Sequence, residues 1–111
     1  MRTEYNKLIR DRIPEIISET GKTFVVTTLT RNEFARALAE KLVEEAQEVC
    51  SSDLAHITDE LADVSEIIDA LLKVHGLENN NLEKAKEKRR RERGGFEKRL
   101  KLLYVDDPTE S

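Results

Sequence analysis

Residues 41–74 read KLVEEAQEVCSSDLAHITDELADVSEIIDALLKV, and this stretch decides the fold. Apolar residues recur at three- and four-residue spacing on both sides of Ser51-Ser52-Asp53, which is the pattern of two amphipathic helices. Serine and aspartate favour helix N-caps, so this break should end one helix and begin the next. We therefore predict two long antiparallel helices, from about Arg31 to about Val49 and from about Leu54 to about Val74.

The segments before this helical pair predict a capped start and a minor β element. Thr30 to Glu33 reads TRNE, a capping-box pattern in front of the first long helix. Pro14 suits the first turn of a short helix, and Gly21 suits the position after its end. Thr23 to Leu29 is rich in β-branched residues, which predicts a short strand.

The segments after the pair predict a third helix and a second short strand. Asn79-Asn80-Asn81 should cap a basic helix from about Leu82 to about Arg93, which Gly94-Gly95 ends. The sequence KLLYV at 101–105 would then lie beside the first strand. We expect one domain over 1–111, with an N-terminal arm, short helix and strand (1–30), a helical core (31–93) and a C-terminal segment (94–111).

Composition excludes several protein classes. The 111 residues are 38% apolar, 38% charged and 5% aromatic, whereas globular domains are about 45–50% apolar and about 25% charged. Four glycines, two prolines and no tryptophan disfavour a β-sandwich or barrel. Scarce apolar residues in long stripes favour helices that bury part of their faces in a homodimer or homotetramer.

The single Cys50 excludes an internal disulfide and a cysteine zinc cluster. We expect a cytoplasmic protein without a membrane partner, since no apolar run approaches about 18 residues and no signal peptide is recognisable.

Acidic side chains enter the apolar stripes of both long helices. At about 100° per residue, Glu45 falls inside the stripe of the first helix, with Glu48 at its border. Glu60 falls inside the stripe of the second helix, with Asp63 on its flank. Packing these stripes together would gather four carboxylates, whose repulsion requires a cation. Oxygen ligands favour Mg²⁺, with Mn²⁺ as a substitute, although a solvated acidic face remains an alternative.

Charge is divided along the chain. Ten acidic residues lie between Glu40 and Asp69 against Lys41 alone, and ten basic residues lie between Leu82 and Leu103 against four acidic ones. Helical spacing places three candidate phosphate-binding cations on one face, and a fourth precedes the paired glycines: Lys84, Lys88, Arg91 and Arg93. The alternatives are a solvated basic face and a nucleic-acid-binding helix. The net charge of −4 and the few aromatic residues argue against nucleic acid.

The acidic blocks resemble a known signature. KLVEEAQEV followed by DELADVSEIIDAL resembles the EExxE…ExxD signature of the all-α nucleoside triphosphate pyrophosphohydrolases, which include MazG-like proteins, dimeric dUTPases and phosphoribosyl-ATP pyrophosphohydrolases. YNKLIRDRIPEII and KEKRRRERGGF resemble a MazG-like, phosphoribosyl-ATP pyrophosphohydrolase-like subfamily. The four blocks extend from Tyr5 to about Leu102.

This resemblance implies a mainly α, all-α nucleoside triphosphate pyrophosphatase-like fold and a Mg²⁺-dependent hydrolase. It implies cleavage between the α- and β-phosphates of a nucleotide, giving a monophosphate and pyrophosphate, in nucleotide-pool house-cleaning. The implied Mg²⁺ ligands are Glu45, Glu48, Glu60 and Asp63, with Glu44 in an outer position. We take Glu48 as the general base, with Glu45 as a second catalytic residue.

The N-terminal block leaves more than one interpretation open. Lys7 and Arg10 match the opening of the subfamily and are candidates for contact with the substrate. They could equally anchor the arm, and Arg10 could pair with Asp11. Two other functions also stay open: a phosphoribosyl-ATP pyrophosphohydrolase, and a non-catalytic helical interaction or nucleic-acid-binding module.

Overall fold

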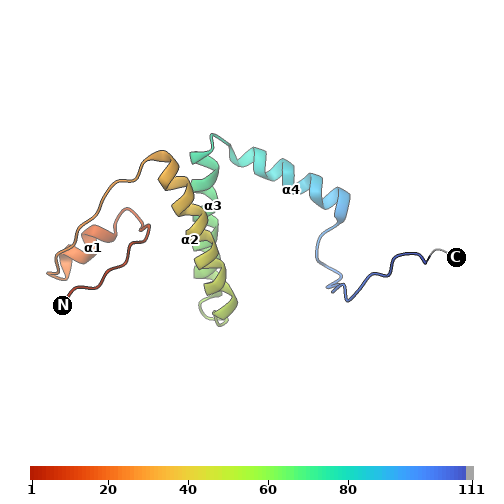
Figure 1. The fold of residues 1–111 in the computed structure, drawn as a ribbon, viewed down its shortest axis with the longest axis horizontal. Coiled ribbons are helices and arrows are strands. Elements are labelled where there is room, and N and C mark those ends of the chain that lie inside the picture. Colours follow the sequence, from red (N-terminus) through yellow and green to blue (C-terminus); the bar gives the residue numbers. More distant parts are fainter. Residues whose placement is uncertain (110–111) are drawn as a thin grey trace. The chain divides into compact units, whose positions relative to one another are not determined.

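The computed structural model describes residues 1–109, which contain helices and no strand. The helices of this part of the chain are α1 (Ile13–Glu19), α2 (Arg31–Ser51), α3 (Ile57–Val74) and α4 (Asn79–Arg93) (Figure 1). The chain divides into two compact units, the first comprising Met1–Asn79 and the second beginning at Asn80. The mainly α fold class is therefore confirmed. Within the described residues, no helix is both long enough and apolar enough to cross a membrane.

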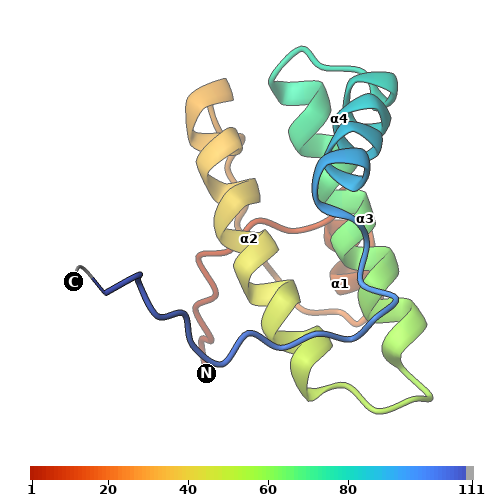
Figure 2. The same ribbon diagram turned by 90° about the vertical axis from the view of Figure 1, so that its right-hand side faces the viewer.

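The predicted helix pair forms the centre of the first unit. α2 and α3 run antiparallel and side by side, joined by residues 52–56 (Figures 1 and 2). The buried apolar side chains of the described chain are Leu38 of α2 and Ile67 of α3, which are 4% and 6% exposed. Apolar residues elsewhere on the pair stay open, including Val43 at 60% and Leu61 at 51% exposure. The hairpin therefore has a narrow core.

The first long helix begins as its sequence predicts. The Thr30 hydroxyl accepts a hydrogen bond from the Glu33 amide at 3.2 Å, and the Glu33 carboxylate accepts one from the Thr30 amide at 2.9 Å. The reciprocal capping box is thus complete, which satisfies two backbone donors that the helix itself leaves free. The bond from the Thr30 amide also lowers the pKa of Glu33, because it favours the charged carboxylate.

The second long helix begins three residues later than predicted. Residues 54–56 form a turn, because the Asp53 carboxylate accepts from the His56 amide at 3.1 Å and lies 2.6 Å from His56 Nδ1. Asp53 therefore caps a turn before the helix. The end of α3 is as predicted, with Gly76 at a left-handed φ of 70°. The Gly76 amide donates to the Lys73 carbonyl at 3.1 Å, and the Leu77 amide donates to the Leu72 carbonyl at 2.8 Å.

Arg31 links the two helices at the open end of the hairpin. Its Nη2 and Nε donate to the Val74 carbonyl at 2.7 and 3.1 Å. The last carbonyls of a helix have no intrahelical partner and carry partial negative charge. The guanidinium at the start of α2 therefore caps the end of α3.

The predicted β element is wrong. Thr23–Leu29 and the KLLYV segment at 101–105 have no strand structure, and residues 1–109 as a whole contain none. A strand needs a hydrogen-bonded neighbour, and β-branched composition alone does not supply one. The side chains of Val25 and Val105 are 98% and 73% exposed, so most of the apolar surface of these segments is not packed.

The second unit is dominated by the basic helix. α4 begins at Asn79, three residues earlier than predicted, so the asparagines at 79–81 lie in its first turn and do not precede it as caps. It ends at Arg93 as predicted, and Gly94 follows with a left-handed φ of 81°. Ion pairs form on its surface between side chains three and four residues apart. They join Lys86 to Glu83 (3.6 Å), Lys88 to Glu92 (3.9 Å) and Arg91 to Glu87 (3.3 Å).

Candidate metal and nucleotide site

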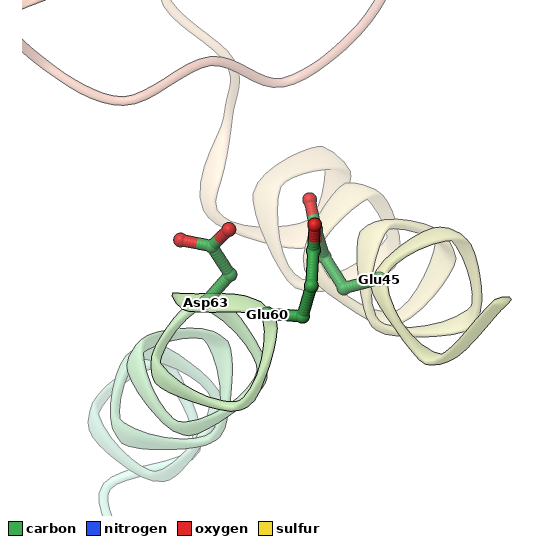
Figure 3. A group of neighbouring side chains, drawn as sticks. All are labelled: Glu45, Glu60 and Asp63. Atoms are coloured by element: carbon green, nitrogen blue, oxygen red, sulfur yellow. The ribbon is translucent and has the colours of Figure 1, made fainter. Parts of the chain in front are cut away.

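Three of the four predicted metal ligands converge across the hairpin. Glu45 extends from α2, and Glu60 and Asp63 extend from α3 (Figure 3). One carboxylate oxygen from each lies within 4.8 Å of the other two. Residues three apart share a helix face, so α3 presents both of its acids to the same side. We call these three residues the carboxylate cluster.

Glu48 lies outside the carboxylate cluster. Glu48 is exposed to solvent, whereas the three members of the cluster are half-buried. Its charge acts instead on Lys7, where it adds to the effects that raise the pKa of that amine. Of the two predicted catalytic residues, Glu45 belongs to the carboxylate cluster and Glu48 does not.

The Glu45 carboxylate is largely enclosed. Its side chain is only 14% exposed, and Lys41 Nζ lies 3.9 Å from its Oε1. Burial raises the pKa of Glu45 by disfavouring its charged form, and the nearby charges of Asp63 and Glu60 raise it further. Lys41 acts in the opposite direction. The seam therefore holds more negative charge than its own lysine offsets.

Two cations reach the hairpin from residues 1–12, which we call the arm. Lys7 Nζ lies 2.9 Å from Glu44 Oε1 on α2, and Arg10 Nη2 lies 2.6 Å from Asp63 Oδ1 on α3. The carboxyl groups in Figure 3 point toward the side on which the pale red N-terminal segment crosses. The hydrogen bond between Lys7 and Glu44 raises the pKa of the lysine and lowers that of the glutamate. Of these two arm cations, Arg10 pairs with a member of the carboxylate cluster, Asp63.

The donor set of the cluster fits Mg²⁺. All of its ligand atoms are carboxylate oxygens, which hard divalent cations prefer. A Mg–O distance of about 2.0–2.1 Å places two ligands of one octahedral ion about 2.9 Å apart in cis or about 4.2 Å apart in trans. The oxygens of the cluster lie within 4.8 Å of one another, which is the range of separation that ligands of one ion require. Water or phosphate oxygens would complete the coordination.

The predicted phosphate-binding cations of α4 belong to the second unit. All four are exposed: Lys84, Lys88, Arg91 and Arg93. Arg93, Gly94 and Gly95 line a hollow of about 480 Å³ within this unit, together with Lys98 and Arg99. A polyanion could meet both side-chain cations and glycine backbone there.

Sequence reasoning did not single out three cations that the structure places at these sites. Lys41 reaches Glu45, and its four-residue spacing on α2 was the available signal. Lys98 and Arg99 line the same hollow as the glycines, and their position just after GGF was the corresponding signal.

Comparison with known proteins gives little further information. No family model matches the sequence, and no solved structure matches it. A protein of Mycolicibacterium smegmatis (strain ATCC 700084 / mc(2)155), described only as uncharacterized, is 47% identical over 47 residues. That match covers 42% of this chain and 48% of the relative, so it spans about half the length of that protein. Its description names no activity.

Proposed function

We propose that this protein is a Mg²⁺-dependent nucleoside triphosphate pyrophosphohydrolase, resembling MazG-like enzymes, that cleaves between the α- and β-phosphates. The convergence of Glu45, Glu60 and Asp63 carries the proposal. These residues come from the two acidic blocks of the sequence resemblance and meet across the hairpin seam. A cluster of this kind on its own is common on protein surfaces. Its coincidence with the EExxE…ExxD pattern supports the assignment.

The cluster would hold the metal, and the other residues would manage charge and protons. When bound, Mg²⁺ would neutralise phosphate charge and acidify a water molecule. A carboxylate that remains free can accept the proton of that water. Glu48 is one candidate, because it is exposed on the next turn of α2, and Glu45 is the other. The arm cations Lys7 and Arg10 would bind the phosphates and stabilise charge in the transition state.

We also infer that the protein acts as a homodimer or homotetramer. The support is the small number of buried apolar residues, Leu38 and Ile67, beside exposed ones on the same hairpin such as Val43 and Leu61. Exposed apolar surface on paired helices favours packing against a second copy. Sedimentation of the purified protein across a concentration series tests this inference, and a monomer at all concentrations would contradict it.

Pyrophosphate release from a nucleotide panel tests the proposed activity. We expect release that requires Mg²⁺ or Mn²⁺ and is abolished by EDTA. Glu60→Gln and Asp63→Asn should each lower kcat/KM by at least about 100-fold while preserving the helical circular dichroism spectrum. Glu66→Gln, an exposed change on the same helix, is the matched control and should retain activity. Turnover by both cluster variants equal to that of the wild type would refute the site.

The same assay separates the alternatives. Phosphoribosyl-ATP belongs in the substrate panel, and a strong preference for it would identify the biosynthetic activity instead of house-cleaning. A nucleic-acid-binding module would show no turnover and an affinity for strands that falls steeply with salt. Glu48→Gln tests the base, because loss of the base lowers kcat without abolishing metal binding, whereas loss of the metal ligand Glu45 should abolish both.

A further inference from the structure

Asp63 serves two partners that cannot both be satisfied in full. Its carboxylate belongs to the cluster, and its Oδ1 also accepts from Arg10 at 2.6 Å. A guanidinium stays positively charged and donates directional hydrogen bonds to the lone pairs of a carboxylate. A divalent ion held by the cluster would require the same carboxylate and would repel the arginine. Arg10 thus stands where it competes with a metal ion.

We propose that the arm is a strap that Lys7 and Arg10 fasten over the cluster in the metal-free protein, and that a divalent cation displaces Arg10 from Asp63. This inference rests on the proposed function, because it needs the cluster to bind a metal. Lys7 is paired with Glu44, which lies outside the cluster, so that contact persists when Arg10 leaves. The strap therefore opens at one end, and the released guanidinium becomes available to a phosphate of the incoming nucleotide.

The contact between Arg10 and Asp63 is exposed to solvent, which suits an ion pair that breaks and forms reversibly. The side chains of Arg10 and Asp63 are 55% and 40% exposed, so water and salt screen their attraction. An exposed pair of this kind shifts an equilibrium by a few-fold only. A divalent ion that meets three carboxylates carries twice the charge and more ligands, so it should win the competition. The arginine would still lower the apparent metal affinity by the fraction of time that it occupies Asp63.

Metal titration without nucleotide tests the competition. Isothermal titration of Mg²⁺ and Mn²⁺ is compared for the wild type, Arg10→Met and the matched control Arg12→Met. Arg12 lies two residues away and pairs with Glu15 at 2.9 Å, so its removal deletes the same charge from the arm without touching the hairpin. We expect about two- to five-fold tighter metal binding for Arg10→Met and a smaller change for Arg12→Met. Equal affinities in all three proteins would overturn the proposal.

Nuclear magnetic resonance of the arginine side chains tests the release itself. In the metal-free wild type, the Arg10 guanidinium signals should show slowed rotation and slowed exchange, and Mg²⁺ should shift them to those of a free side chain. The Arg12 signals serve as the internal reference. Tighter binding by Arg10→Met with unmoved Arg10 signals in the wild type would refute displacement. Failure of all variants to bind either metal would refute both this inference and the proposed function, whereas metal binding with an unmoved Arg10 would refute the strap alone.

Discussion

Replacing Glu45 with glutamine should make the metal-free protein more stable and remove its response to Mg²⁺. Glu45 is 14% exposed and lies within 4.8 Å of acidic oxygens of Glu60 and Asp63. Two unit charges at this distance repel by roughly 1 kcal/mol in water and by roughly 3.5 kcal/mol at an effective dielectric constant of 20. Lys41, at 3.9 Å, offsets part of this repulsion. We therefore expect a net stabilisation of about 1–2 kcal/mol.

Thermal unfolding in EDTA and in excess Mg²⁺ measures both effects. A gain of about 1 kcal/mol raises the Tm of a domain of this size by roughly 4–8 °C, so Glu45→Gln should melt above the wild type in EDTA. Mg²⁺ at about 100 times its Kd should stabilise the wild type by about 2.7 kcal/mol and leave the variant nearly unchanged. Glu66→Gln, an exposed change on α3, controls for the loss of one negative charge.

The pH dependence of folding stability provides a second test of the same prediction. The pKa of Glu45 is raised in the folded state, chiefly by burial, so the folded protein holds this proton more tightly than the unfolded chain does. The destabilisation by Glu45 is therefore absent below its ordinary value of 4.5 and develops as pH rises through the raised pKa. The stability gap between variant and wild type should open over that window. A variant that melts below the wild type in EDTA, or that keeps the full Mg²⁺ response, would refute the reasoning.

Three further predictions concern the hairpin. Leu38→Ala should cost about 2–3 kcal/mol, at the low end for a buried leucine because the core is narrow, and urea denaturation measures the loss. Arg31→Ala should cost about 1 kcal/mol by freeing the Val74 carbonyl, with faster amide exchange in the last turn of α3; unchanged exchange would contradict the cap. Thr30→Ala should cost about 1 kcal/mol by removing the hydroxyl acceptor of the cap. The Thr30 amide, whose bond is the main cause of the lowered pKa of Glu33, remains, so thermal melts across acidic pH should show that the variant still loses stability as pH falls below 4.5, by somewhat less than the wild type.

The helices and their caps could be predicted from the sequence because they depend on short-range chemistry. Thr30 and Glu33 lie three residues apart, and their reciprocal bonds follow from that spacing. Gly76 ends α3 because glycine adopts the left-handed conformation without a steric penalty. The short strand failed for the opposite reason, since Thr23–Leu29 would need a partner that no local pattern can provide.

The carboxylate cluster was only partly predictable. Helical angles placed Glu45 and Glu60 on the seam, but a border residue such as Glu48 can turn either way, and the packing of α2 on α3 left it exposed. Asp63, on the flank of the stripe of the second helix, joined the cluster. Angular position on a single helix does not fix which flank its neighbour covers.

The sequence by itself determined two amphipathic helices with acids in their apolar stripes, because periodicity and capping act within a few residues. Only the tertiary structure decided which acids meet and which cations neutralise them. The contact between Arg10 and Asp63 joins residues 53 positions apart, and that between Lys7 and Glu44 joins residues 37 apart. Contacts at such separation depend on how the whole first unit packs, since attraction between exposed charges is too weak to select a partner without that packing.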